Sequence, residues 1–256
     1  MISGLPVWVC AYEGGADLAK QLANPVAALV SVPFQYNYDA DIGPADDGTR
    51  HTLNIQPVVP ISLDEKWNII SRTILPLVSQ DDISPNAGSQ SGTGDIVQSL
   101  FFSPKEPSDA GWIWGVGPVF LLPTGSDDLL TADKWGVGPT AVALKQENGW
   151  TYGALANHIW SFAGEDNRSD ISATFVQPFL SFTTPDAITY AINTESTYDW
   201  KNSDWTIPLN ATVSKVTKFG DQLVSIGGGV RYWVDGPASA PEGLALRVIV
   251  TLLFPK

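Results

Sequence analysis

The last ten residues, RVIVTLLFPK at positions 247–256, determine how the rest of the chain is interpreted. They are rich in β-branched and apolar residues, whereas the whole chain carries a formal net charge of −13. Apolar residues alternate from Leu246 through Val248 and Val250 to Phe254, which is the two-residue period of a β-strand. Such a strand either lies in a protein core or has one face against lipid, and the features below favour lipid.

The composition excludes several classes of protein. A length of 256 residues suits one large all-β domain. Charged residues make up only 16% of the chain and there are 10 tryptophans, so surface charge is scarce and interfacial aromatics are abundant. The acidic balance argues against a nucleic-acid partner. Cys10 is the only cysteine, so no disulfide framework or cysteine-based metal site is expected.

The segments with strand chemistry are spaced regularly along the chain. We expect about twelve strands of about 10 to 14 residues each, after one short helix at 16–23. The strands are expected near 28–39, 50–62, 66–79, 94–104, 111–122, 134–146, 149–163, 170–183, 187–200, 204–218, 222–234 and 243–254. Connections after even-numbered strands are short, and most of those after odd-numbered strands are longer and acidic. This asymmetry predicts a closed up-and-down antiparallel transmembrane β-barrel, not a sandwich.

Alternation within the strands predicts one apolar face and one wet face. In 30–39, Val30, Phe34 and Tyr36 share one face, and Asn37 and Asp39 share the other. A lipid-facing exterior and a watery interior require this pattern. The candidate lumen-lining residues are Arg72, Arg231, Arg247, Asp39, Glu195, Asp199, Asn193 and Asn210. They either set pore width and ion preference or form salt bridges that fill a narrow barrel.

Most tryptophans lie near the ends of expected strands. Indole rings gather at membrane interfaces because the ring prefers an apolar contact and its N–H prefers water. The residues expected at the interfaces are Trp67, Trp112, Trp135, Trp150, Trp205, Trp233 and Phe254.

Two features oppose a simple channel. Prolines cannot donate to a β-ladder, so we expect those inside strands to sit at bulges or irregular parts of the wall; they are Pro33, Pro57, Pro76, Pro118, Pro139, Pro178 and Pro208. An outer-membrane phospholipase would place a His and a Ser two positions apart on one strand face. His158 and Ser161 are three apart and face opposite sides, so we expect His158 to be a wall residue that finds a hydrogen bond.

Four stretches carry a resemblance to a known family: LANPVAALVSVPFQYNYD at 22–39, the paired WGVGP at 114–118 and 135–139, VFLLPTG at 119–125, and VTLLFPK at 250–256. They resemble the outer-membrane β-barrel family described as a putative transporter, as part of a MetA pathway of phenol degradation and, by mislabelling, as neuromedin U. The resemblance extends over most of the chain from about Leu18. It implies an outer-membrane barrel, and it assigns no functional residues.

The sequence therefore predicts a barrel at 27–256 in a bacterial outer membrane. Residues 1–26 are expected to form a leader, either a remnant export signal or a disordered segment, and a short periplasmic helix or plug. We expect passive passage of a small apolar or aromatic solute, with no enzymatic activity, cofactor or metal. The expected partners are outer-membrane lipid, the solute and, during insertion, the barrel-assembly machinery. Two alternatives remain: a non-conducting structural or adhesive barrel, and a soluble secreted β-domain that binds a ligand.

Overall fold

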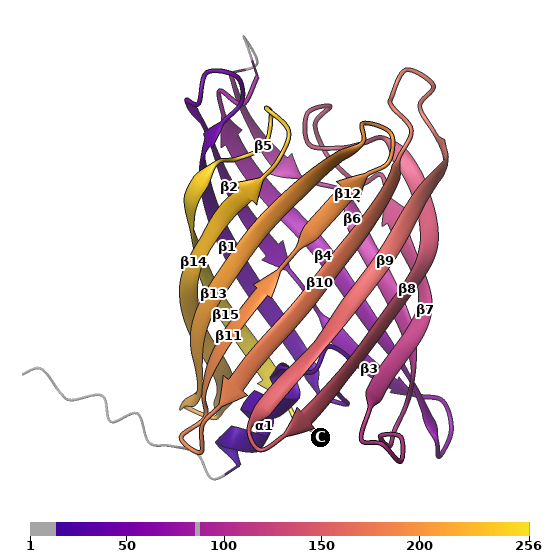
Figure 1. Cartoon of the computed structure of the whole chain (residues 1–256), viewed down its shortest axis with the longest axis vertical. Coiled ribbons are helices and arrows are strands. Elements are labelled where there is room, and N and C mark those ends of the chain that lie inside the picture. The colour runs from indigo at the N-terminus through magenta and orange to yellow at the C-terminus, as the bar shows by residue number, and fades with distance from the viewer. Residues whose placement is uncertain (1–13, 85–87, 256) are drawn as a thin grey trace, which may run out of the picture.

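The computed structural model describes residues 14–84 and 88–255, and it is a closed β-barrel with one short helix at one end (Figure 1). The predicted leader, including Cys10, lies before the described residues. The elements are α1 (Gly15–Leu22), β1 (Val30–Ile42), β2 (Gly48–Ile55), β3 (Val58–Ser62), β4 (Trp67–Asp81), β5 (Ser89–Thr93), β6 (Ile96–Pro104), β7 (Ile113–Leu122), β8 (Lys134–Glu147), β9 (Trp150–Gly164), β10 (Ser172–Thr183), β11 (Ile188–Thr194), β12 (Ser196–Asp199), β13 (Asp204–Phe219), β14 (Gln222–Asp235) and β15 (Gly243–Phe254).

The fifteen strands occupy twelve positions around the barrel, because β2 and β3, β5 and β6, and β11 and β12 each follow one another along the same position. Every pairing is antiparallel. The first and last strands pair from Val30 opposite Phe254 to Tyr38 opposite Leu246, which closes the barrel. The predicted fold and the role of the C-terminal run as the closing strand are confirmed.

Prolines account for the three interruptions. Pro57 lies between β2 and β3, and Pro76 accepts a hydrogen bond from Gly94 in the gap between β5 and β6. The registers on either side of the β11–β12 gap place Pro178 opposite Thr194 and Pro208 opposite Glu195. Neither proline has an N–H for the ladder, so the pairing lapses there. Pro208 also coincides with a register shift. The hypothesis that prolines sit at irregular parts of the wall is confirmed at these positions. It is wrong for the β1–β15 and β7–β8 ladders, where Pro33 lies opposite Thr251 and Pro118 lies opposite Pro139 without a break in register.

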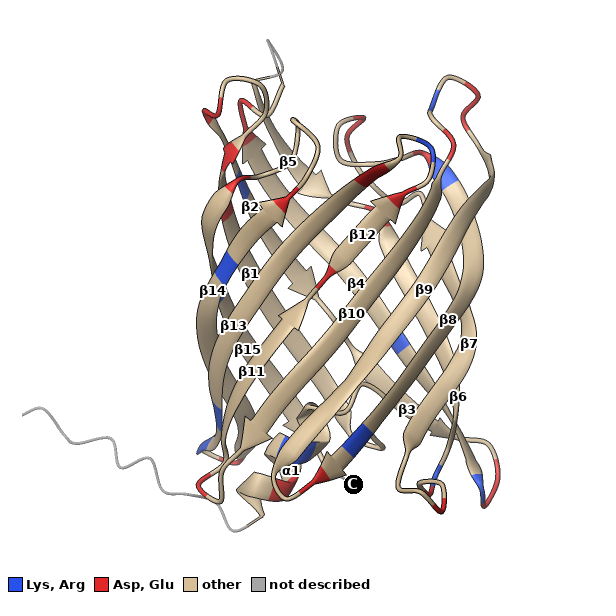
Figure 2. Ribbon diagram, viewed as in Figure 1, with Lys and Arg blue, Asp and Glu red and all other residues tan. Residues whose placement is uncertain are grey.

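The connections differ at the two ends. One end carries the turns 63–66, 105–112, 148–149, 184–187 and 220–221. The other carries the loops 43–47, 123–133, 165–171, 200–203 and 236–242, together with residues 82–84 and 88. The loop end also holds most of the acidic residues (Figure 2). In outer-membrane barrels short turns face the periplasm and long loops face outward, so we name the end that carries α1 the periplasmic end.

The outward face of the wall is apolar. Exposed apolar side chains include Ile192, Leu209, Leu246 and Val248, each about half exposed. A water-soluble domain does not present so large a continuous apolar surface. The alternative of a soluble secreted domain is therefore wrong. Within the described residues, no helix has the length and apolar character needed to cross a membrane.

The lumen is polar along β1 and β13–β15 but apolar along the opposite wall. Ile70, Phe101, Val142, Leu144 and Leu155 form a buried cluster from β4, β6, β8 and β9. Close strand approach within this wall depends on the two WGVGP motifs. A Cβ on their second glycines, Gly117 and Gly138, would collide with backbone oxygens of the neighbouring strands.

The segment 15–29 crosses the lumen at the periplasmic end. Leu18 and Leu29 pack with Val216 and Leu253 on one wall, whereas Val26 packs within the apolar cluster on the other wall. The helix has Asp17 in its first turn and Lys20 in its last, which suits the helix dipole. The helix expected at 16–23 is confirmed.

Candidate functional site

A layer of charged and amide side chains covers the polar wall of the lumen. The register puts Asn37 opposite Arg247 and Asn210 opposite Arg231, so these side chains share the inward face. We call this set the charged layer; it comprises Asn37, Asp39, Asn193, Glu195, Asn210, Arg231, Trp233 and Arg247.

Glu195 is the centre of the charged layer. Its Oε1 accepts a hydrogen bond from Arg247 Nη1 at 2.9 Å, and its Oε2 accepts one from Arg247 Nη2 at 2.8 Å. Arg231 Nη2 donates to the same Oε2 at 2.8 Å. One carboxylate therefore binds two guanidinium groups, and it reaches across β13 and β14 to do so. Its place in the β11–β12 gap, beside Pro208, lets its backbone leave the regular ladder.

The remaining members hold the two arginines in place. Arg247 Nε donates to Asn37 Oδ1 at 2.8 Å, and Arg231 Nε donates to Asn210 Oδ1 at 3.0 Å. Arg231 Nη1 lies 3.6 Å from Asp39 Oδ1. Since both arginine side chains are less than a tenth exposed, these contacts replace the water that the charges lose on burial.

Asn193 extends the same layer, because Asn210 Nδ2 donates to Asn193 Oδ1 at 2.9 Å. The structure therefore brings together six of the eight predicted lumen residues: Asp39, Asn193, Glu195, Asn210, Arg231 and Arg247. They do not face one another across open lumen, as the sequence suggested, but lie on neighbouring strands of one wall.

Arg72 and Arg50 lie on the wall beside this layer and differ from it. Arg72 Nη2 donates to Gln56 Oε1 at 3.4 Å, and Arg50 Nε donates to Gln80 Oε1 at 3.0 Å. Within the described chain neither arginine forms an ion pair. The lumen thus holds four guanidinium groups and two carboxylates, Asp39 and Glu195, in its central part. The sequence did not identify Arg50 as a lumen residue, because only its pairing with Asp39 shows that its side chain points into the lumen.

One predicted position was wrong, and another lies outside the charged layer. Trp233 does not lie at the membrane interface: its Nε1 donates to Asp39 Oδ1 at 2.9 Å, and Arg231 lies 5.0 Å from its ring. Two residues apart on one strand, Arg231 and Trp233 must share a face. Asp199 is not in the charged layer, because it accepts hydrogen bonds from Lys201 and Asn202 and so shapes the turn after β12.

The other predicted interface aromatics lie near the two ends of the wall. Trp67, Trp112, Trp150 and Phe254 are at the periplasmic end, and Trp135 and Trp205 are at the loop end. Trp135 and Trp150 are 46% and 44% exposed. These positions match two aromatic belts on an apolar band.

The loop-end rim is held by ion pairs. Arg168 Nε lies 3.2 Å from Asp133 Oδ2, and Lys134 Nζ lies 3.3 Å from Asp170 Oδ1. The hydrogen bond from Lys134 holds the pKa of the Asp170 carboxyl below its usual value. At the opposite end, backbone N–H groups of Lys66 and Trp67 donate to Asp64 and lower its pKa.

His158 is a wall residue, as predicted, and it finds a hydrogen bond. Its Nδ1 lies 2.7 Å from Thr174 Oγ1, and its Nε2 lies 3.4 Å from Ser172 Oγ. Ser161 instead accepts a hydrogen bond from Ile171. In the part of the chain that the structure describes, no carboxylate contacts the imidazole, so the ring lacks the orienting acid of a Ser-His-Asp site.

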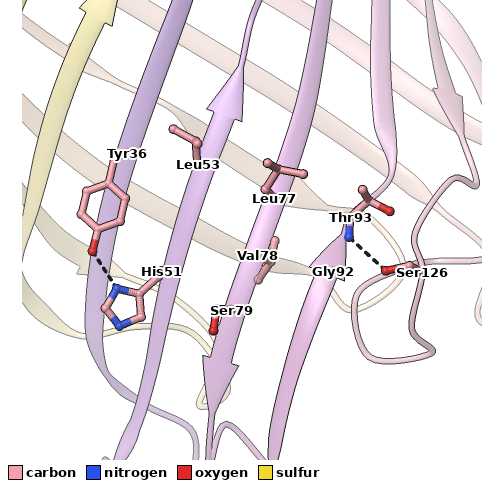
Figure 3. Close-up of a pocket in the computed structure, with 9 residues that line it drawn as sticks. All are labelled: Tyr36, His51, Leu53, Leu77, Val78, Ser79, Gly92, Thr93 and Ser126. Atoms are coloured by element: carbon pink, nitrogen blue, oxygen red, sulfur yellow. Dashed lines mark hydrogen bonds between the residues drawn. The ribbon is translucent and has the colours of Figure 1, made fainter.

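Two cavities differ in which side of the wall they open to. One, of about 550 Å³, is lined by Tyr36, His51, Leu53 and Leu77 (Figure 3). These side chains lie on the outer face, so this cavity faces lipid, with Tyr36 Oη 2.7 Å from His51 Nδ1. The other, of about 290 Å³, lies inside the barrel between the segment 19–29 and the charged layer. We call it the luminal cavity.

The closed barrel, its apolar outer face and its aromatic belts define an integral protein of the bacterial outer membrane. No protein-family model matches the chain, and no curated protein matches it significantly. Among solved structures it is similar to the COG4313 outer membrane channel from Pseudomonas putida F1, with a TM-score of 0.70 and 16% identity over 98% of this chain and 100% of that one. This likeness shows a shared fold.

Two other solved structures match with lower scores. The β domain of the Bordetella autotransporter BrkA has a TM-score of 0.48 and 10% identity, over 89% of this chain and 100% of that one. The calcium-bound dimer of Salmonella typhi outer membrane phospholipase has a TM-score of 0.48 and 12% identity, over 96% and 99%.

Proposed function

We propose that the protein is an outer-membrane channel for passive passage of a small apolar or aromatic solute, and that it is not an enzyme. The luminal cavity is the observation that carries this proposal. Its walls combine apolar side chains, such as Phe179 and Ile249, with amides, such as Gln35 and Gln56. Mostly apolar surface with a few placed polar groups is typical of small-molecule sites. The similar fold of a protein described as an outer membrane channel supports the proposal.

We propose that the segment before β1 acts as a plug, with the predicted division near residue 26. The segment bridges two opposite walls, and Gln146 Nε2 donates to the Lys20 carbonyl oxygen at 2.7 Å. Because few polar contacts hold it, passage requires only that this segment shift within the periplasmic mouth. We also propose that the barrel contacts outer-membrane lipid and that the barrel-assembly machinery inserts the protein into the membrane.

The alternative is a structural barrel that conducts nothing. The charged layer is the observation that favours this alternative, because its buried ion pairs fill part of the lumen. Liposome swelling separates the two. Vesicles containing the wild-type protein should swell in small solutes and swell faster with a variant that lacks residues 1–29. Conductance in a planar bilayer should rise in parallel. If that variant folds but gives neither swelling nor conductance steps, the channel proposal is wrong.

A further inference from the structure

The luminal cavity contains one charged side chain. Among the described residues that line it, Arg72 is the only one with a formal charge. The other polar lining groups are amides and hydroxyls, and the rest are apolar. A lone cation in a cavity with low-dielectric walls attracts an anion more strongly than the same cation in water.

Arg72 has donors to spare. A guanidinium group carries five N–H donors, and the hydrogen bond from Arg72 to Gln56 is long, at 3.4 Å. Arg231 and Arg247, by contrast, each donate to a carboxylate at 2.8 Å. Arg72 therefore forms no ion pair within the described chain and feels the Glu195 carboxylate only at longer range, and its side chain borders the cavity.

A second polar group in the same cavity, the Ser181 hydroxyl, has no hydrogen-bond partner among the described residues. Ser181 is only 6% exposed and lines the cavity from β10. Its Oγ is the one buried side-chain atom in the described residues for which no hydrogen-bond partner is found. A buried hydroxyl without a partner costs free energy, and a ligand that hydrogen-bonds to it removes that cost.

Apolar side chains line part of the same cavity. Phe179 lies two positions before Ser181 on the same face of β10. Leu22, Val58 and Ile249 contribute further apolar lining. A volume of about 290 Å³ is near the lower limit of typical small-molecule pockets, roughly 300–1000 Å³. A single ring with one anionic group suits this size and this distribution of polarity.

We infer that the luminal cavity is a binding site for a small monoanionic carboxylate with an apolar ring, with Arg72 as the carboxylate-binding group. Guanidinium and carboxylate pair through two parallel hydrogen bonds, which explains why an arginine with free donors suits this position. Ser181 supplies a second polar contact. The inference deepens the proposed function, because it names the class of solute and the residue that selects it.

Benzoate and its neutral isostere benzamide are the probes, with binding to the full chain in detergent measured by calorimetry. Wild-type protein should bind benzoate at least about tenfold more tightly than benzamide, the preference expected from one charge-assisted contact. Arg72→Gln should abolish that preference, and Arg72→Lys should retain part of it. Arg50→Gln is the matched control, because it removes the same charge from the lumen at a residue that does not line the cavity.

Equal loss of benzoate preference in Arg50→Gln and Arg72→Gln would overturn the assignment, because general luminal charge would then explain binding. Wild-type protein that does not distinguish the two probes would also overturn it. If Arg72→Gln fails to fold, thermal unfolding of the wild type still decides, since benzoate but not benzamide should raise its midpoint. Benzoate binding without any swelling of vesicles would refute the channel and keep this site, and swelling without benzoate preference would do the reverse.

Discussion

Replacing Glu195 by Gln tests whether the charged layer stabilises the barrel. The substitution keeps the size of the side chain and removes the charge that two arginines share. Arg247 would lose its only carboxylate among the described residues, and its side chain is 2% exposed. Removing one partner of a buried ion pair costs about 3–5 kcal/mol. Because Glu195 itself is 21% exposed, we expect the lower value, about 3 kcal/mol.

Equilibrium unfolding by urea in lipid vesicles measures this loss, with the fluorescence of the 10 tryptophans as the signal. A double-mutant cycle with Arg247→Met isolates the pairwise energy, which should reach about 2 kcal/mol. Glu106→Gln, in the exposed turn 105–112, is the control and should change little. If Glu195→Gln lies within about 0.5 kcal/mol of wild type, luminal water solvates these arginines and the argument from burial fails.

Three further changes test the plug, the aromatic belts and the rim. Val26→Asp places a carboxylate in the apolar cluster, so it should loosen the plug and raise single-channel conductance, whereas Val26→Leu should not. Brominated lipid should quench less fluorescence in Trp150→Phe than in wild type, and as much in Trp233→Phe as in wild type, because Trp150 faces lipid and Trp233 faces the lumen. The pKa of the Asp170 carboxyl is lowered in the folded protein. The ion pair of Asp170 with Lys134 therefore contributes fully to stability above the pKa of the unfolded chain, near 3.8, and this contribution is lost as pH falls through the folded pKa. Carbon-13 titration of Asp170 should show the lowered pKa, and Lys134→Met should return it to its usual value.

The strands were predictable because lipid imposes a simple pattern on them. Apolar residues must occur at every second position on a wall that faces hydrocarbon, and short turns must alternate with longer loops. The strand expected at 204–218 is Asp204–Phe219 in the structure, and the one expected at 243–254 is Gly243–Phe254. Irregularities were expected at prolines, but which prolines interrupt a strand depends on the residues opposite them on neighbouring strands, and the sequence alone does not show those.

The site was only partly predictable for the same reason. Alternation within one strand shows which side chains point into the lumen, and it identified Arg231, Arg247 and Glu195. Their contacts follow from the curvature of a closed barrel, which brings Glu195 over two intervening strands to Arg247. Trp233 was misplaced because its nearness to a strand end was given more weight than the face it shares with Arg231.

Charge at the rim and charge in the lumen act with different strength. Most acidic residues lie toward the loop end of the barrel (Figure 2), where salt screens the field of exposed charges within about 8 Å at physiological ionic strength. The luminal arginines are enclosed by protein, so their field is screened much less. The acidic net charge of the chain therefore does not predict a preference for cations. Ion preference should follow the surplus of guanidinium groups in the lumen, and Arg72, which has no ion pair within the described chain, contributes most directly to it.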